Sequence, residues 1–115
     1  MPSPPLVPDD GPIDFEHLSR MTLGDPALEC EVLSMFVAQS ARLLDRLAPL
    51  PAETGSIAHT LKGSARAIGA FAVAEAASRL EAALPEAGDA RSALAALRDA
   101  VAEAQGVIEA FLSRG

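Results

Sequence analysis

His59, Lys62 and Gly63 lie within a span of five residues in the stretch AHTLKGSA, and Lys62 is the only lysine of the chain. Another cation, Arg66, follows four residues after Lys62. A neutral imidazole nitrogen is a competent nucleophile near pH 7, and nearby cations stabilise charge on a phosphoryl group that moves to it. These residue types at this spacing predict phosphoryl transfer to His59.

The position of His59 around the predicted helix determines whether its side chain faces the core or the solvent. The apolar side of this helix holds Ile57, Leu61, Ala65 and Ile68. At about 100° per residue, His59 lies roughly 200° from Ile57, on the outward side. Arg66 at roughly 180° and Lys62 at roughly 140° are predicted to flank it there. A surface histidine without function is the alternative interpretation.

Gly63 is an unusual residue for the middle of a helix, because it costs about 1 kcal/mol relative to Ala. It leaves the surface beside the imidazole without a side chain, so that a partner can approach closely. A purely structural helical bundle offers no reason for this glycine.

The rest of the chain predicts an all-α scaffold. The 115 residues suffice for one domain, half of them are apolar, and the aromatic residues are four phenylalanines without Trp or Tyr. The net charge of −7 argues against nucleic acid and anionic membranes as partners. A single cysteine and the lack of a long apolar run favour a cytoplasmic protein. No phosphate-binding loop or metal-ligand cluster is recognisable.

We divide the chain into a flexible Pro-rich tail, residues 1–12, and a bundle, residues 13–115. The predicted helices span about 14–21, 26–48, 53–68, 71–84 and 89–112. The first is a short capping helix, and the four long ones predict an up-and-down antiparallel four-helix bundle.

Two apolar stripes are predicted to face the core of this bundle. The stripe of the second predicted helix consists of Leu28, Val32, Met35, Gln39, Leu43 and Leu47, supplemented by Leu33, Phe36 and Leu44. The stripe of the last helix consists of Leu94, Leu97, Val101, Ala104, Ile108 and Phe111.

Residues 59–65, HTLKGSA, with Gly69 ten positions after the histidine, closely resemble the HxLKGxA…G signature of histidine-containing phosphotransfer domains, the HPt family. Residues 13–18 and the following Gly24, Asp25 and Pro26 are similar to the entry helix and GDP turn of that family. The resemblance covers about residues 13–112.

The resemblance implies that His59 accepts a phosphoryl group from a phospho-aspartate on a response-regulator receiver domain and passes it to another receiver. Lys62 and Arg66 would steady the phosphoryl group, and Gly63 would admit the edge of the receiver. Glu81 stands twenty-two positions after His59, where the family often has a residue that hydrogen-bonds the other imidazole nitrogen. An ordinary solvated glutamate is the alternative interpretation of Glu81.

The resemblance also implies the partners: receiver domains and a hybrid sensor kinase, with Mg²⁺ supplied by the receiver and no cofactor of the chain's own. A kinase activity is not expected, because nothing resembles a nucleotide-binding domain. A monomer is expected, because one chain completes the bundle. The alternative function is a receiver-docking or scaffolding bundle without obligatory phosphotransfer.

Overall fold

The computed structural model describes residues 11–114, and in this range it contains five helices and no strand. The helices are α1 (Phe15–Met21), α2 (Pro26–Leu47), α3 (Thr54–Ile68), α4 (Phe71–Ala83) and α5 (Ala87–Arg114). The prediction of an all-α protein is confirmed, and the predicted boundaries agree to within two residues. Most of the predicted tail, residues 1–10, lies outside the described residues.

Local signals explain where several helices begin and end. Asp14 caps α1 by accepting a hydrogen bond from the backbone N–H of His17, and Asp25 caps α2 in the same way from Ala27 and Leu28. Pro26 occupies the first position of α2, where its missing N–H costs nothing. Gly69 ends α3 at a φ of 87°, in the left-handed region that favours glycine.

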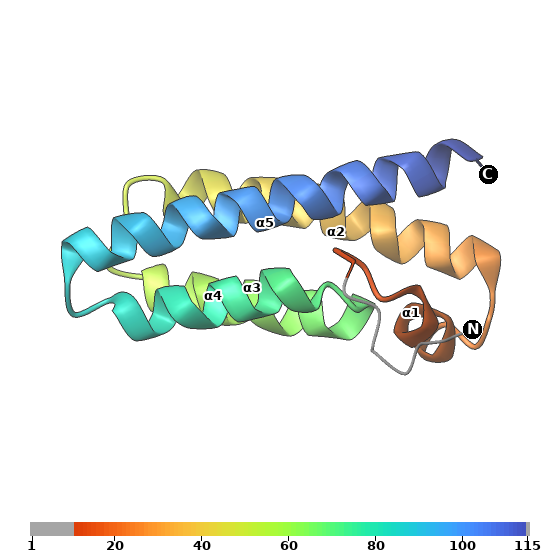
Figure 1. Ribbon diagram of the computed structural model, residues 1–115, viewed down its shortest axis with the longest axis horizontal. Helices are drawn as coiled ribbons and strands as arrows, with labels where there is room; N and C mark the ends of the chain where they lie inside the picture. Colours follow the sequence, from red (N-terminus) through yellow and green to blue (C-terminus); the bar gives the residue numbers. More distant parts are fainter. Residues whose placement is uncertain (1–10, 115) are drawn as a thin grey trace, which may run out of the picture.

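The four long helices pack around one core (Figure 1). In chain order, α2 packs on α3, α3 on α4 and α4 on α5, and α5 returns to α2. Figure 1 shows α2 and α5 along one side of the bundle and α3 and α4 along the other. The stripe predicted on the last helix is buried as far as Ile108, and Phe111 is half-buried against Phe15 with ring centroids 5.0 Å apart.

The short helix α1 is fastened to the turn between α3 and α4. The backbone N–H of Asp14 donates a hydrogen bond of 2.9 Å to the carbonyl oxygen of Gly69. Ile13 and Leu18 are both fully buried. A Cβ at Gly69 would lie 2.7 Å from the carbonyl oxygen of Asp14, so this contact requires a glycine.

The prediction for the core face of α2 is wrong in part. The buried residues of this helix are Leu33, Phe36, Ser40, Leu43 and Leu47. Leu28 and Met35, which were assigned to the core, are 38% and 63% exposed. The apolar stripe is wider than the surface that α3 and α5 cover, so part of it faces solvent.

Candidate functional site

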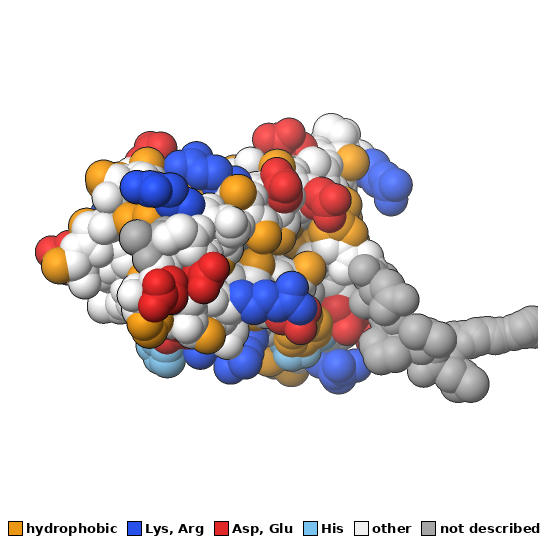
Figure 2. All heavy atoms as spheres, turned by 60° about the vertical axis from the view of Figure 1, so that its left-hand side comes forward, with side chains coloured by type: hydrophobic (Ala, Val, Ile, Leu, Met, Phe, Trp, Pro, Cys, Tyr) orange, Lys and Arg blue, Asp and Glu red, His pale blue; other side chains and the backbone are white. Residues whose placement is uncertain are grey.

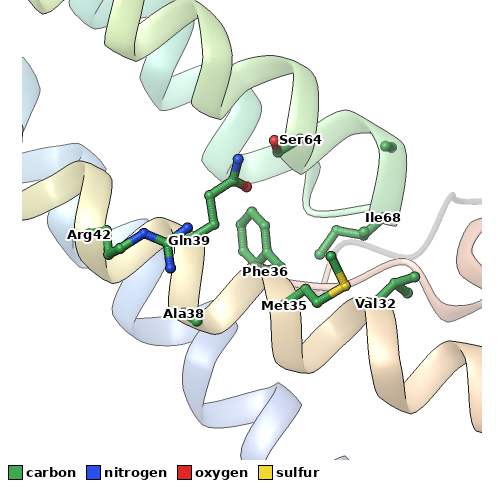
Figure 3. A pocket seen from close by; sticks show the side chains of 9 residues that line it. Val32, Met35, Phe36, Ala38, Gln39, Arg42, Ser64 and Ile68 are labelled. Carbon is green, nitrogen blue, oxygen red and sulfur yellow. The ribbon is translucent and has the colours of Figure 1, made fainter.

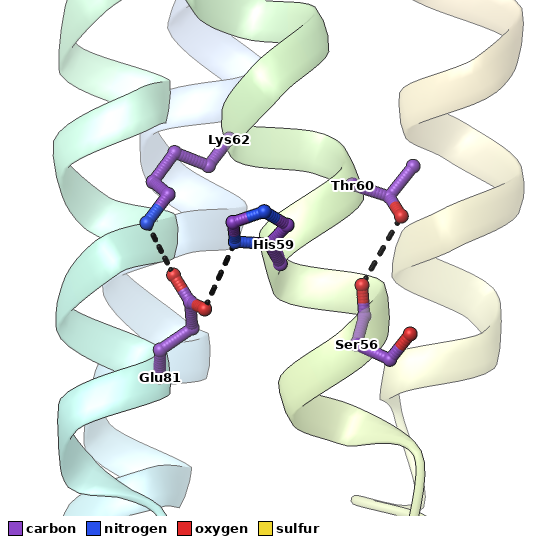
Figure 4. Close-up of polar contacts among 5 residues, drawn as sticks. All are labelled: Ser56, His59, Thr60, Lys62 and Glu81. Atoms are coloured by element: carbon purple, nitrogen blue, oxygen red, sulfur yellow. Dashed lines mark hydrogen bonds and ion pairs between the residues drawn. The ribbon is translucent and has the colours of Figure 1, made fainter.

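His59 projects from the exposed side of α3. Ile57, Leu61 and Ala65 of the same helix are buried, as the predicted phase requires, whereas the side chain of His59 is 72% exposed. The neighbouring hydroxyl of Thr60 donates to the carbonyl oxygen of Ser56 at 3.1 Å (Figure 4). That hydroxyl is thereby tied to its own helix.

Glu81 reaches His59 from the adjacent helix α4. Its Oε2 lies 3.3 Å from Nδ1 of the imidazole (Figure 4). When the ring is neutral, this arrangement favours the tautomer that carries its proton on Nδ1, because a carboxylate accepts a hydrogen bond from N–H. Nε2 then keeps a free lone pair, and Figure 4 shows it on the side of the ring away from Glu81.

Lys62 also contacts Glu81, with Nζ 2.7 Å from Oε1. At this distance the two opposite charges form an ion pair. The sequence placed Lys62 on the outward side of the helix beside His59; in the structure its ammonium lies at Glu81, and its side chain is only 17% exposed. Its long apolar stem lies across the boundary between α3 and α4, and its ammonium ends at the carboxylate.

The pKa of Glu81 is lowered by these neighbours. The contact with the Lys62 ammonium is the main cause, and His59 adds to it, while partial burial of the carboxylate acts in the opposite direction. Glu81 is therefore ionised at neutral pH, and its negative charge faces both His59 and Lys62.

Gly63 and Arg66 complete the predicted set. Nothing lies within 4 Å of the place where a Cβ on Gly63 would stand, so the surface beside His59 is open. Arg66 is exposed and, within residues 11–114, forms no ion pair with a carboxylate. Glu81 thus contacts both His59 and Lys62, whereas Arg66 forms no ion pair with Glu81.

The other histidine, His17, has a different environment. Its Nε2 is buried and has no hydrogen-bond partner within the described residues. Its ring packs edge-on against Phe71, with centroids 5.1 Å apart. This nitrogen is closed to a phosphoryl donor, in contrast to the exposed ring of His59.

A groove of about 520 Å³ between α2 and α3 borders the surface at Gly63, beside His59 (Figure 3). Its lining includes Val32, Met35, Phe36 and Gln39 of α2 and Ser64 and Ile68 of α3. This groove was not predicted from the sequence, although an apolar stripe too wide for one buried face was a signal of an uncovered strip on α2.

Side chains of both charges are interspersed on the face of the molecule shown in Figure 2. Along its lower edge, His side chains lie among Lys or Arg side chains, with Asp or Glu side chains close to them. The net charge of the chain is −7.

Residues 11–114, which the structure describes, contain no group of three or more His, Cys, Asp or Glu residues that could hold a metal ion. None of the helices between residues 11 and 114 is long and apolar enough to cross a membrane.

Comparison with known proteins agrees with the pattern around His59. A search of curated proteins and a search of solved structures gave no significant match. The family model of the Hpt domain matches residues 31–111, which is more than two thirds of the chain and includes His59, Lys62, Gly63 and Glu81. The resemblance noted in the sequence is thereby confirmed, and the chain belongs to the Hpt domain family, whose members serve histidine phosphotransfer in phosphorelays.

Proposed function

We propose that this protein is a phosphorelay intermediate in which His59 accepts a phosphoryl group from the phospho-aspartate of one receiver domain and passes it to another. The observation that carries the proposal is the exposed imidazole whose Nδ1 lies 3.3 Å from an ionised Glu81. This contact leaves Nε2 as the nucleophile. Helices α2–α5, as an up-and-down four-helix bundle, provide the rigid support.

The transfer step needs no proton movement within this chain. The lone pair of Nε2 attacks phosphorus, and the bond between phosphorus and the aspartate oxygen breaks, with its electron pair returning to the carboxylate. His59 keeps the proton on Nδ1, and the positive charge that develops on the ring faces the carboxylate of Glu81. The Mg²⁺ that neutralises the phosphoryl oxygens would come from the receiver.

The docking surface of the receiver would extend from Gly63 to the groove between α2 and α3. Ser64 and Ala67 line the groove and follow Gly63 on α3 by one residue and by one turn. Met35, at 63% exposure, offers an apolar contact beside it. Such a strip, with Gln39 and Arg42 at its margin, suits an interface with an apolar centre and a polar rim.

The proposal is tested by phosphoryl transfer from a panel of phosphorylated receiver domains to the purified chain. His59→Gln should abolish labelling while the helical circular dichroism spectrum and the Tm are retained, because the side chain is exposed. The matched variant His17→Gln should still be labelled. The label should be stable to base and labile to acid, as phosphohistidine is.

A label that mass spectrometry assigns to His17, or labelling that persists in His59→Gln, would contradict the proposal. The cytoplasm as location, the monomeric state and a hybrid kinase as the first donor belong to the same proposal. Size-exclusion chromatography with light scattering tests the monomer.

A further inference from the structure

The two cations near His59 differ in what they contact. Lys62 is largely covered, and its ammonium lies 2.7 Å from Oε1 of Glu81. Arg66 is exposed and pairs with no carboxylate in the part of the chain that the structure describes. An ammonium that a carboxylate already neutralises attracts a second anion less than an unpaired cation at a similar distance. Arg66 is therefore the more available cation on this face.

The spacing of His59 and Arg66 along α3 allows their side chains to approach each other. Arg66 follows His59 by seven positions, which is about 20° short of two full turns. Both residues therefore lie on one line of the helix, about 10.5 Å apart along its axis. Side chains on a helix lean toward its N-terminus. A long side chain such as that of Arg66, leaning in this way, can reach over the preceding turn in the direction of His59.

Gly63 stands between the two residues and leaves this path clear, because nothing lies near the position that its Cβ would take. In Figure 4, Nε2 of His59 is on the side of the ring away from Glu81 and toward the turn that carries Lys62, which is the C-terminal direction of α3. A phosphoryl group on Nε2 would thus be attached between the ring and Arg66.

We infer that the guanidinium of Arg66 binds the phosphoryl group on His59 across the open position of Gly63, while Lys62 stays with Glu81 and holds its carboxylate against Nδ1. The inference rests on the proposed function and deepens it by giving the two cations separate roles. A guanidinium can donate two parallel N–H bonds to two phosphoryl oxygens, which an ammonium cannot do. In this role Arg66 donates hydrogen bonds to the phosphoryl group and takes part in no covalent step. The covalent bonds that form and break during transfer are those described for the proposed function.

Phosphoramidate allows a test that needs no partner protein. When it reacts with the full chain, the bond from Nε2 to phosphorus forms as the phosphorus–nitrogen bond of the reagent breaks and ammonia leaves. At low ionic strength, labelling of Arg66→Ala should be about two- to fivefold slower than that of the wild type, with Arg66→Lys between them. Arg98→Ala removes the same charge from an exposed position of α5 and should label at the wild-type rate.

Nuclear magnetic resonance can detect contact between Arg66 and the phosphoryl group directly. A residue with only a structural role would show no change in its side-chain resonance when His59 is phosphorylated. In ¹⁵N-labelled protein, the side-chain Nε–H resonance that disappears in Arg66→Lys should shift downfield when His59 is phosphorylated and return when the phosphoryl group hydrolyses. An unchanged Arg66 resonance, or equal labelling rates for Arg66→Ala and Arg98→Ala, overturns the inference and leaves the proposed function intact. Absence of any label on His59 from phosphoramidate and from phosphorylated receivers overturns both.

Discussion

The carboxylate of Glu81 contacts an imidazole with one oxygen and an ammonium with the other. It draws the two functional residues of α3 toward α4, and its lowered pKa keeps it charged at neutral pH. The ion pair with Lys62 is more covered than the other pair on α4, between Glu75 and Arg79, whose side chains are both mostly exposed. Breaking the pair of Glu81 and Lys62 should therefore lower the stability of the fold more than breaking the pair of Glu75 and Arg79.

Glu81→Gln should reduce the free energy of unfolding at pH 7 by about 0.5–1 kcal/mol, because it leaves the largely covered Lys62 without its anion. A carboxyl whose pKa is lower in the folded state stabilises the fold above its ordinary pKa of 4.5, and this contribution is lost as the pH falls through the lowered value. The Tm difference between wild type and variant should therefore shrink as the pH falls from 7 to below 4.5, which thermal melts at several pH values measure.

The control for this prediction is Glu75→Gln, which breaks an exposed i,i+4 pair on the same helix. It should change the Tm less than Glu81→Gln does at pH 7. A Tm difference for Glu81→Gln that stays constant as the pH falls would show that the charge of Glu81 does not carry the effect.

At the scale of the element, α3 combines a buried apolar face with an outward face that is open at Gly63. Its amphipathic phase orients His59, and the missing side chain leaves room beside the ring. Helix α2 contributes an apolar strip that its neighbours leave uncovered. Each of these features predicts a substitution that separates stability from phosphoryl transfer.

Gly63→Gln should stabilise α3 and impair transfer. The higher helix propensity of Gln should raise stability by somewhat under 1 kcal/mol, because the added side chain meets open space. The same side chain would lean over the preceding turn, beside His59, and hold the phospho-aspartate out of line, where about 1 Å can cost roughly a hundredfold in rate. Thermal melts and transfer rates from a receiver measure the two effects.

Gly106→Gln in α5 is the matched control, since the space around Gly106 is also open. It should raise the Tm by a similar amount and leave transfer unchanged. Transfer at the wild-type rate in Gly63→Gln would mean that the glycine does not serve the approach of a partner.

Met35→Lys should weaken docking of the receiver without loss of stability. Met35 is 63% exposed at the groove, so the Tm should change little, whereas a charge in an apolar contact should raise the KM for the phosphorylated receiver about five- to tenfold. Labelling by phosphoramidate should be unaffected, because it needs no docking surface. Met21→Lys, at a methionine of similar exposure outside the groove, should behave as the wild type in both assays.

At the scale of the whole molecule, the backbone hydrogen bond between Asp14 and Gly69 joins the capping helix to the turn after the functional helix. Gly69→Ala should lower the Tm by about 5 °C or more, since a left-handed backbone costs an L-residue about 1–2 kcal/mol and the new Cβ would meet the carbonyl oxygen of Asp14 at 2.7 Å. Gly106→Ala, in mid-helix and open space, should instead hold or raise the Tm. A Gly69→Ala variant that melts with the wild type would show that the turn relaxes without cost.

The helix boundaries and the orientation of His59 were predictable from the sequence, because both depend on nearby residues. Asp14, Asp25 and Gly69 mark helix ends through contacts within a few residues, and the period of Ile57, Leu61 and Ala65 orients α3. The family pattern around His59 is equally local.

The pairing of Lys62 and the exposed strip of α2 were decided only by the tertiary structure. Lys62 and Glu81 are nineteen positions apart, and they meet because α3 packs against α4. The periodicity of α2 shows that Leu28 and Met35 lie on an apolar stripe, but it carries no information on how much of that stripe α3 and α5 cover. A helix specifies its own faces by local spacing, whereas its burial depends on the shape and placement of its neighbours.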